Sequence, residues 1–170
     1  MGIAARWIRL VHRERASLRA AYAGFAQAQP WRAAPTVFWA PEDEDRFGFA
    51  LIVPLRFAPG RPWRWRRWAL APSIATYRKF DERAYLEGDD IWLGGRKIAA
   101  SEAAAVGGCA VISSGFLPRL AQLRADWTER NVEAAFRGRL EAQNGWQFDH
   151  SWPSTLERLA ISGALAEEAN

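Results

Sequence analysis

Apolar runs separated by turn residues predict short strands in the first third of the chain. Residues 7–11 and 36–40 are rich in aromatic and branched apolar side chains, which favour strands. Residues 47–57 form a longer apolar run of the same character that carries Pro54. Because proline cannot donate a hydrogen bond to a neighbouring strand, we expect this run to form an edge strand or to contain a bulge.

Helical patterns are clear at one place in this part of the chain and ambiguous at another. The alanine and leucine content of residues 14–29 predicts a helix that ends at Pro30. Residues 65–80 are ambiguous because Pro72 lacks the N–H group that a helix interior needs. Within them, residues 73–77 alternate as a strand does, so a continuous helix is not expected.

Two alternating segments flank a pair of glycines and predict a β-hairpin. Ile91 and Leu93 lead into Gly94 and Gly95, and Ile98 follows on the way out. A two-residue hairpin loop needs positive φ at both positions, which glycine adopts at little cost. The segment therefore predicts two strands joined by a tight turn.

The last third of the chain is predicted to be helical after a strand at residues 109–113. Apolar residues recur at helical spacing in two stripes, which are Leu120, Leu123 and Trp127, then Val132, Phe136 and Leu140. The pair Asn144 and Gly145 suits a left-handed C-terminal cap. Ser154 and Glu157 match the capping box, which predicts the start of a final helix.

These elements together predict an α+β domain with a mostly antiparallel sheet and helices packed on it. A chain of 170 residues, 49% hydrophobic, is long enough for one core. We expect a single domain over residues 1–170, with the sheet in 1–117 and C-terminal helices in 118–170. No apolar run reaches the roughly 20 residues that span a bilayer, and residues 1–10 do not resemble a signal peptide, so we expect a cytoplasmic protein without membrane contact.

Cysteine and histidine chemistry is restricted by composition. The single cysteine, Cys109, excludes an internal disulfide and a cysteine-rich zinc site, and we expect it to be a small core residue. The two histidines, His12 and His150, disfavour a Ser-His-Asp triad or a histidine metal site. No metal site is therefore predicted, and we expect His150 to make a local hydrogen bond.

Arginine and tryptophan alternate in residues 61–68, within a chain whose net charge is +4 and whose pI is near 9.8. One interpretation is a non-catalytic binding module that engages an acidic protein or nucleic acid, because arginine binds anions and tryptophan stacks on many partners. The other is a strand with one solvated face of arginines. Nucleic acid is not the favoured partner.

Aromatic residues also gather in residues 143–153 near the C-terminus. Exposed rings beside hydrogen-bonding neighbours suit a lid or a partner surface. The alternative, which we favour, is that these rings close the core beneath a loop.

The predicted hairpin presents Lys97, and Lys79 is the only other lysine in this arginine-rich chain. An ammonium group can polarise a carboxyl oxygen or an α-phosphate, and Asp90 could orient it or hold magnesium. The pair suits activation of a carboxylate. A hairpin that ends in Arg-Lys is also a common solvated turn, and the spacing alone leaves both interpretations open.

The run from Asp89 to Ser101 resembles the signature N-D-I-x-x-x-G-R-K-I-[AS]-G of the biotin and lipoate protein ligase superfamily, with the same spacing. Residues 107–117 are similar to the strand of lipoate ligases and octanoyl transferases that carries a His-Gly element. The resemblance is clear over residues 86–117. It implies the fold of class II synthetases and biotin and lipoate ligases, and a divergent member of that superfamily.

By position, the resemblance implies that Lys97 is the catalytic lysine, which contacts the carbonyl of the acyl-adenylate. It implies substrate-binding roles for the matching positions, which are Asp90, Gly95, Arg96, Ala99, Ala100, Ser101, Ser114 and Gly115. The implied ligand is a carboxylic acid or acyl group such as lipoate or biotin, with ATP and magnesium as cofactors if ligase activity is retained. The implied macromolecular partner is an acceptor protein that carries a lipoyl or biotinyl domain.

The sequence departs from the family in three respects. Ala100 and residues 113–115 replace glycine and the histidine element, and an acidic turn at 41–46 lies where the family has an arginine- and glycine-rich phosphate loop. Octanoyl transferases use a cysteine well downstream of the lysine, and Cys109 lies too early to match it. We therefore expect either an altered acyltransferase or ligase or a pseudoenzyme that binds the ligand.

Overall fold

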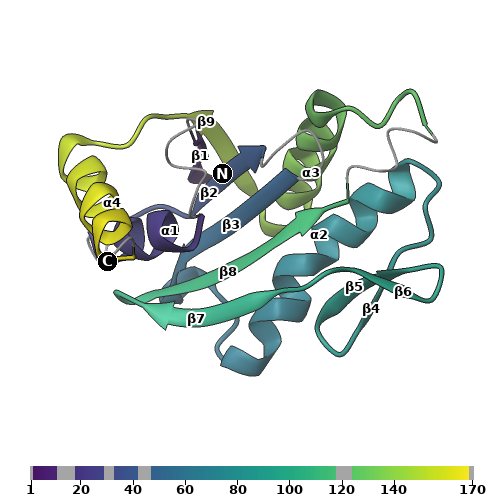
Figure 1. Ribbon diagram of the computed structural model, residues 1–170, viewed down its shortest axis with the longest axis horizontal. Helices are drawn as coiled ribbons and strands as arrows, with labels where there is room; N and C mark the ends of the chain where they lie inside the picture. The colour runs from purple at the N-terminus through teal and green to yellow at the C-terminus, as the bar shows by residue number, and fades with distance from the viewer. Residues whose placement is uncertain (1, 11–17, 29–32, 42–46, 118–123, 169–170) are drawn as a thin grey trace.

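The computed structural model describes residues 2–10, 18–28, 33–41, 47–117 and 124–168. Within these ranges the chain forms a six-stranded mixed sheet covered by helices on both faces, with a second sheet of three strands beside it (Figure 1). The predicted α+β architecture is confirmed.

The six-stranded sheet is mostly antiparallel, as predicted. Its strands, in order across the sheet, are β7 (Glu102–Val106), β8 (Cys109–Phe116), β3 (Phe47–Pro54), β2 (Thr36–Pro41), β1 (Ile3–Arg9) and β9 (Trp146–His150). The pairings from β7 to β2 are antiparallel, whereas β1 pairs in parallel with both β2 and β9. The edge strand β9 was not expected from the sequence.

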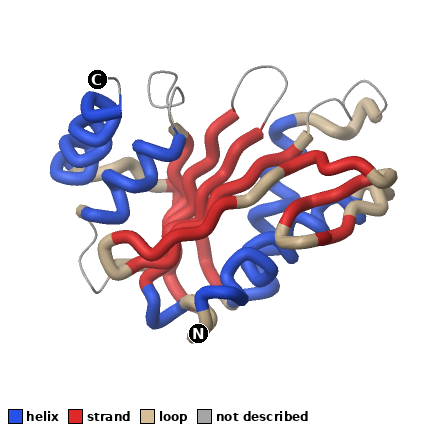
Figure 2. The backbone as a smooth tube through the Cα atoms, turned by 60° about the horizontal axis from the view of Figure 1, so that its bottom comes forward, coloured by secondary structure: helices blue, strands red, loops and turns tan. Residues whose placement is uncertain are grey.

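Helices cover the two faces of this sheet in pairs (Figure 2). One pair is α1 (Leu18–Gln27) and α4 (Thr155–Glu168), and the other is α2 (Trp65–Lys79) and α3 (Glu129–Asn144). Two short 3-10 helices, η2 (Leu55–Phe57) and η3 (Pro62–Arg64), connect β3 to α2. None of the helices in the described ranges is long and apolar enough to cross a membrane.

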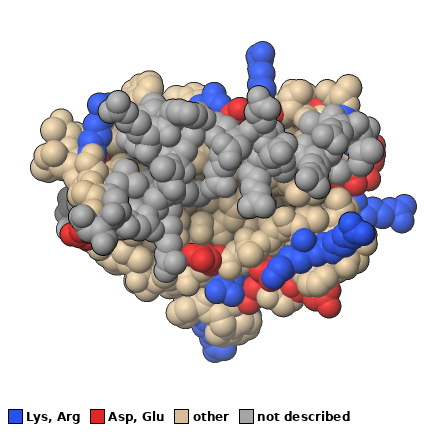
Figure 3. Space-filling model, viewed as in Figure 1, with Lys and Arg blue, Asp and Glu red and all other residues tan. Residues whose placement is uncertain are grey.

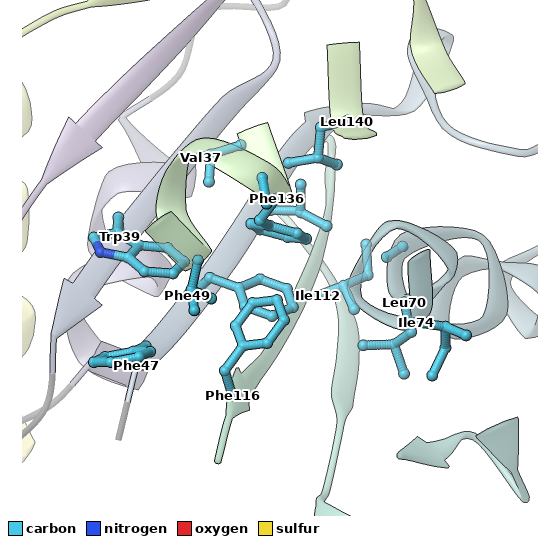
Figure 4. Close-up of a cluster of buried hydrophobic side chains, with 14 of the residues drawn as sticks. Val37, Trp39, Phe47, Phe49, Leu70, Ile74, Ile112, Phe116, Phe136 and Leu140 are labelled. Carbon is cyan, nitrogen blue, oxygen red and sulfur yellow. The ribbon is translucent and has the colours of Figure 1, made fainter. Parts of the chain in front are cut away.

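Successive residues of the central strands point to opposite faces of the sheet and belong to two separate apolar clusters. On one face, Trp39 and Phe49 pack with Phe136 of α3, and the Phe49 and Phe136 ring centroids are 4.5 Å apart (Figure 4). On the other face, Phe38 packs edge-on against Phe25 of α1, with centroids 4.8 Å apart. Each such aromatic pair adds about 0.5–1.5 kcal/mol to the free energy gained by burial.

Helix ends follow the local capping signals. Ser154 and Glu157 form the predicted capping box, in which Ser154 Oγ accepts from the Glu157 N–H and Glu157 Oε2 accepts from the Ser154 N–H, at 3.3 and 2.6 Å. Gly145 caps α3 with a φ of 65°, as predicted. Trp127 is buried but precedes α3, which begins after Thr128, so its expected place in a helical stripe was wrong.

Some predicted segments lie partly outside the described residues. The helix expected at 14–29 is α1, and residues 14–17 and 29 are not described. The same holds for residues 42–46 of the acidic turn, and for Leu120 and Leu123.

The expected edge position or bulge of β3 was wrong, because β3 lies between β2 and β8 at the centre of the sheet. Pro54 is the last residue of β3 and pairs with Cys109 of β8. The next N–H, of Leu55, donates to the Gly108 carbonyl, so the nitrogen of Pro54 faces the β2 side of the strand. There the pairing with β2 has already ended at Ile52. The missing donor therefore costs the sheet no hydrogen bond.

The prediction that Pro72 would interrupt residues 65–80 was also wrong, because α2 continues through it. A residue with an N–H at position 72 would donate to the Trp68 carbonyl one turn earlier. Instead, the side chain of Gln143 near the end of α3 donates to that carbonyl at 3.0 Å. A distant side chain thus compensates for the missing helical hydrogen bond. The strand expected at residues 61–68 is likewise η3 and the start of α2.

We expect Gln143→Met to lower the free energy of unfolding by about 1 kcal/mol, the usual contribution of one such hydrogen bond. In a Pro72→Ala background the same substitution should cost much less, since the backbone N–H that alanine restores at this position can then donate to the Trp68 carbonyl. Urea denaturation of the four proteins measures the difference. Equal losses in both backgrounds would show that Gln143 does not compensate for the proline.

Candidate functional site

The small sheet, which consists of β4 (Tyr85–Glu87), β5 (Asp90–Leu93) and β6 (Arg96–Ala99), contains the predicted hairpin. Gly94 and Gly95 adopt φ values of 57° and 75°, so the two-glycine turn is confirmed. Ile91 is fully buried and Leu93 packs against the same core cluster as α2. This apolar face holds the small sheet against the core, and the other face is left for polar side chains.

Lys97 and Asp90 form an ion pair on the polar face of the small sheet. Trp92 of β5 pairs with Lys97 of β6, and the register shifts by one residue toward Ile91, which pairs with Ala99. The Lys97 Nζ lies 3.4 Å from Asp90 Oδ2. The lysine side chain is 51% exposed and the aspartate 25%, so solvent reaches the ammonium while its partner is better protected.

Asp90 is held in place by the segment that follows the hairpin. Its Oδ1 accepts a hydrogen bond from the Ser101 N–H at 3.2 Å, and Ser101 Oγ donates to the Asp89 carbonyl at 2.5 Å. With one carboxylate oxygen fixed by the backbone, the other is free to orient Lys97. An ammonium has three donors, and one directed at Asp90 leaves two for an incoming oxygen ligand.

Strand β8 joins this group through Ser114, whose Oγ donates to the Ala100 carbonyl at 2.9 Å. The neighbouring Gly115 lies opposite Gly48 of β3, and a Cβ atom at Gly115 would be 3.0 Å from the Phe47 carbonyl oxygen. Close packing of the two strands therefore accounts for this glycine. Ser114 connects the main sheet to the segment that fixes Asp90.

The structure brings five of the predicted site residues into one connected group, which consists of Asp90, Lys97, Ala100, Ser101 and Ser114. Gly95 and Arg96 lie at the exposed tip of the hairpin, and Ala99 packs toward the core. In the space-filling view, basic and acidic side chains lie next to one another over the small sheet (Figure 3).

Sequence reasoning missed two residues beside this group. Asp89, with a φ of 71°, closes the turn between β4 and β5, and its Oδ2 lies 3.9 Å from an Arg66 guanidinium nitrogen at the start of α2. The Gly88–Asp89 pair is itself a hairpin-turn signal that the sequence contained. Trp92 shares the strand face of Asp90, and its buried Nε1 has no hydrogen-bond partner among the described residues.

Other reactive groups in the described part of the chain do not form a second site. No group of three or more His, Cys, Asp or Glu residues is placed there to hold a metal ion. His150 Nε2 lies 2.9 Å from a nitrogen of Arg137, a residue of α3 that is 13 positions away in the sequence. Cys109 is 2% exposed, and burial raises the pKa of its thiol while the charge of Arg56 opposes the rise to a smaller extent. His12 lies outside the described residues.

Solved structures with a similar arrangement of elements include lipoate and biotin ligases. Protein Ta0514, a proposed lipoate protein ligase from T. acidophilum with lipoic acid bound, has a TM-score of 0.76 and 10% identity, covering 98% of this chain and 96% of that one. For lipoate-protein ligase A bound with ATP, the TM-score is 0.76, the identity 11% and the coverage 98% and 95%. Apo biotin protein ligase from Aquifex aeolicus has a TM-score of 0.54 and 12% identity, covering 84% and 69%.

The protein therefore has the α+β fold of lipoate and biotin protein ligases. This confirms, at the level of fold, the resemblance seen over residues 86–117. No protein-family model and no curated protein matches the sequence. The fold places the Asp90 and Lys97 pair but leaves the activity to be argued from the site.

We expect Cys109 to be protected from alkylation in the folded protein. Iodoacetamide at pH 8 should modify it at least about tenfold more slowly in buffer than in denaturant, because the buried thiol rarely forms a thiolate. A Ser162→Cys variant provides an exposed control on α4 that should react quickly in buffer. Mass spectrometry reads out both sites, and rapid native labelling of Cys109 would contradict its place in the core.

Proposed function

We propose that this protein binds a carboxylic acid or an acyl derivative beside Lys97, as a divergent relative of the lipoate and biotin ligases. The observation that carries the proposal is the Lys97 ammonium held 3.4 Å from Asp90, while half of the lysine side chain stays open to solvent. The alternative of an unorganised solvated turn is disfavoured, since a freely solvated lysine needs no aspartate fixed by a backbone N–H.

The charge of Lys97 suits a ligand carboxylate better than a neutral ligand. Asp90 neutralises the ammonium only in part, because their separation exceeds that of a close ion pair and both side chains contact solvent. A carboxylate or acyl carbonyl oxygen can accept from the two remaining N–H groups. The same ammonium would stabilise negative charge that develops on the acyl oxygen during transfer.

Fold neighbours suggest which acids to test. One neighbour holds lipoic acid, another holds ATP, and a third is a biotin protein ligase. We extend the ligand class of these neighbours to this chain, so lipoate, biotin and straight-chain fatty acids are the candidates. An acceptor protein with a lipoyl or biotinyl domain would then be the macromolecular partner, and adenylation would require ATP and magnesium.

Replacement of Lys97 by methionine, which keeps the length of the side chain and removes its charge, should weaken binding of the acid about 10- to 100-fold. This corresponds to the loss of one charge-assisted hydrogen bond of about 1.5–3 kcal/mol. The matched control is Lys79→Met, which removes the only other lysine, at the exposed end of α2. Isothermal titration calorimetry with lipoate, biotin and octanoate measures each dissociation constant.

Unchanged affinity in Lys97→Met, or an equal loss in Lys79→Met, would overturn the assignment of Lys97. The absence of binding by folded wild-type protein to all three acids would overturn the ligand class. Circular dichroism of each variant confirms that the fold is retained.

Exchange of labelled pyrophosphate into ATP separates activation of the acid from its binding. If this protein activates the acid, exchange should require magnesium, the acid and Lys97, because the carboxylate attacks the α-phosphate and releases pyrophosphate. Binding without exchange would instead leave an acyltransferase that does not use ATP or a pseudoenzyme that retains the ligand site. The assay thus separates a ligase from these two alternatives.

A further inference from the structure

Positive charge is concentrated in two parts of the chain. Residues 1–40 contain six arginines and one glutamate, and residues 47–80 contain no aspartate or glutamate. The basic residues in this range are Arg56, Arg61, Arg64, Arg66, Arg67, Arg78 and Lys79. Such a one-sided distribution creates a local positive potential that favours an acidic partner.

Three of these arginines lie close to the junction of η3 and α2. Arg64 ends η3 and Arg67 lies in the first turn of α2, and residues three apart in such helices lie on one side, whereas Arg61 is the extended residue that precedes η3. All three are exposed, and none forms an ion pair with a described carboxylate. Their mutual repulsion therefore has no internal compensation in the described structure.

An exposed tryptophan completes this surface. Trp63 is 67% exposed, and the Arg64 guanidinium carbon lies 5.1 Å from the centroid of its ring. Trp65, by contrast, is 5% exposed and donates from Nε1 to the Pro59 carbonyl at 2.8 Å. Trp65 is thus buried and fixes this segment to the core, whereas Trp63 stays exposed to solvent. We call Arg61, Trp63, Arg64 and Arg67 the η3–α2 surface.

We propose that the η3–α2 surface docks an acidic protein and, resting on the function proposed above, that this protein is the acceptor of the acyl group. Arginine and tryptophan are the residue types that most often dominate protein interfaces. A group of exposed arginines increases the rate of encounter with a negatively charged partner and disfavours the binding of positively charged ones.

The place of the surface favours a protein over a nucleic acid. It lies where α2 begins, at the lower edge of the molecule in Figure 1, and carries the exposed ring of Trp63. Single-stranded nucleic acids are usually held in a groove by several stacked rings. Arg66 in the same turn contacts Asp89, the residue before Asp90, so the surface adjoins the Lys97 site. A protein docked here lies next to that site.

Poly-L-glutamate serves as the probe of protein carboxylates. Its binding to the full chain should weaken about tenfold in an Arg61→Gln, Arg64→Gln, Arg67→Gln variant, and the dependence of affinity on salt should become shallower. Trp63→Ala should weaken binding several-fold without changing the salt dependence. Fluorescence anisotropy of labelled polyglutamate over a range of salt concentrations measures both quantities.

Matched controls separate a specific surface from net charge. Arg78→Gln, Arg130→Gln, Arg139→Gln removes the same charge from three other exposed positions, and Trp152→Ala removes another tryptophan, which is 72% exposed. Both controls should retain wild-type affinity. Equal weakening in the controls would overturn the proposal, because the effect would then come from overall charge or apolar area. Tighter binding of oligouridylate than of polyglutamate at equal charge would overturn it in favour of nucleic acid.

The two proposals fail separately in these measurements. The arginine variant should bind lipoate, biotin or octanoate as the wild type does, and Lys97→Met should bind polyglutamate as the wild type does. Loss of acid binding in the arginine variant would contradict a distinct docking surface. A third outcome is that only Lys97→Met loses affinity for the acid, while all the variants bind polyglutamate with wild-type affinity. This result would support the ligand site at Lys97 and overturn the proposed docking surface.

Discussion

Burial of the central strands on both faces is the constraint on which the rest of the structure depends. Every residue of β3 is buried, and successive side chains point to opposite sides of the sheet. A strand of this kind needs an apolar layer on each side. The pairs α1 and α4, and α2 and α3, provide these layers, and the small sheet packs at the margin of the second. The side chain of Lys97 therefore stays outside the core, where solvent reaches it.

The candidate site combines the exposed ammonium of Lys97 with a series of supporting hydrogen bonds. A lysine side chain has many rotamers, and ordering it costs up to about 2 kcal/mol of conformational entropy. Here the Ser114 hydroxyl ties β8 to the Ala100 carbonyl, the next residue, Ser101, fixes Asp90, and Asp90 orients Lys97. Each link is a single hydrogen bond or ion pair, and together they connect Lys97 to strand β8 of the main sheet.

Features that depend on neighbouring residues could be predicted from the sequence, and features that depend on distant partners could not. The two-glycine hairpin and the capping box of α4 are local, and both were predicted correctly. Within α2, the Trp68 carbonyl that Pro72 leaves without its helical donor accepts from Gln143, which lies 75 residues away. Strand β9 needs β1, at the other end of the chain, as its partner. The candidate site follows the same rule. The hairpin motif indicated Lys97 and Asp90, whereas the contact between Arg66 of α2 and Asp89 could not be predicted.

Charges at the ends of β1 and β2 are arranged differently from those on the η3–α2 surface. Trp7 Nε1 donates to Glu133 at 2.7 Å, and Trp39 Nε1 donates to Glu129 at 3.3 Å. Arg9 forms ion pairs with both carboxylates. The donors that could attract an anion at these strand ends therefore already contact the protein's own carboxylates. Two carboxylates, of Glu129 and Glu133, share the one guanidinium of Arg9. In the described structure the arginines of the η3–α2 surface differ from Arg9 in having no carboxylate partner, and residues 47–80, with seven basic and no acidic residues, carry more positive charge than the net +4 of the whole chain.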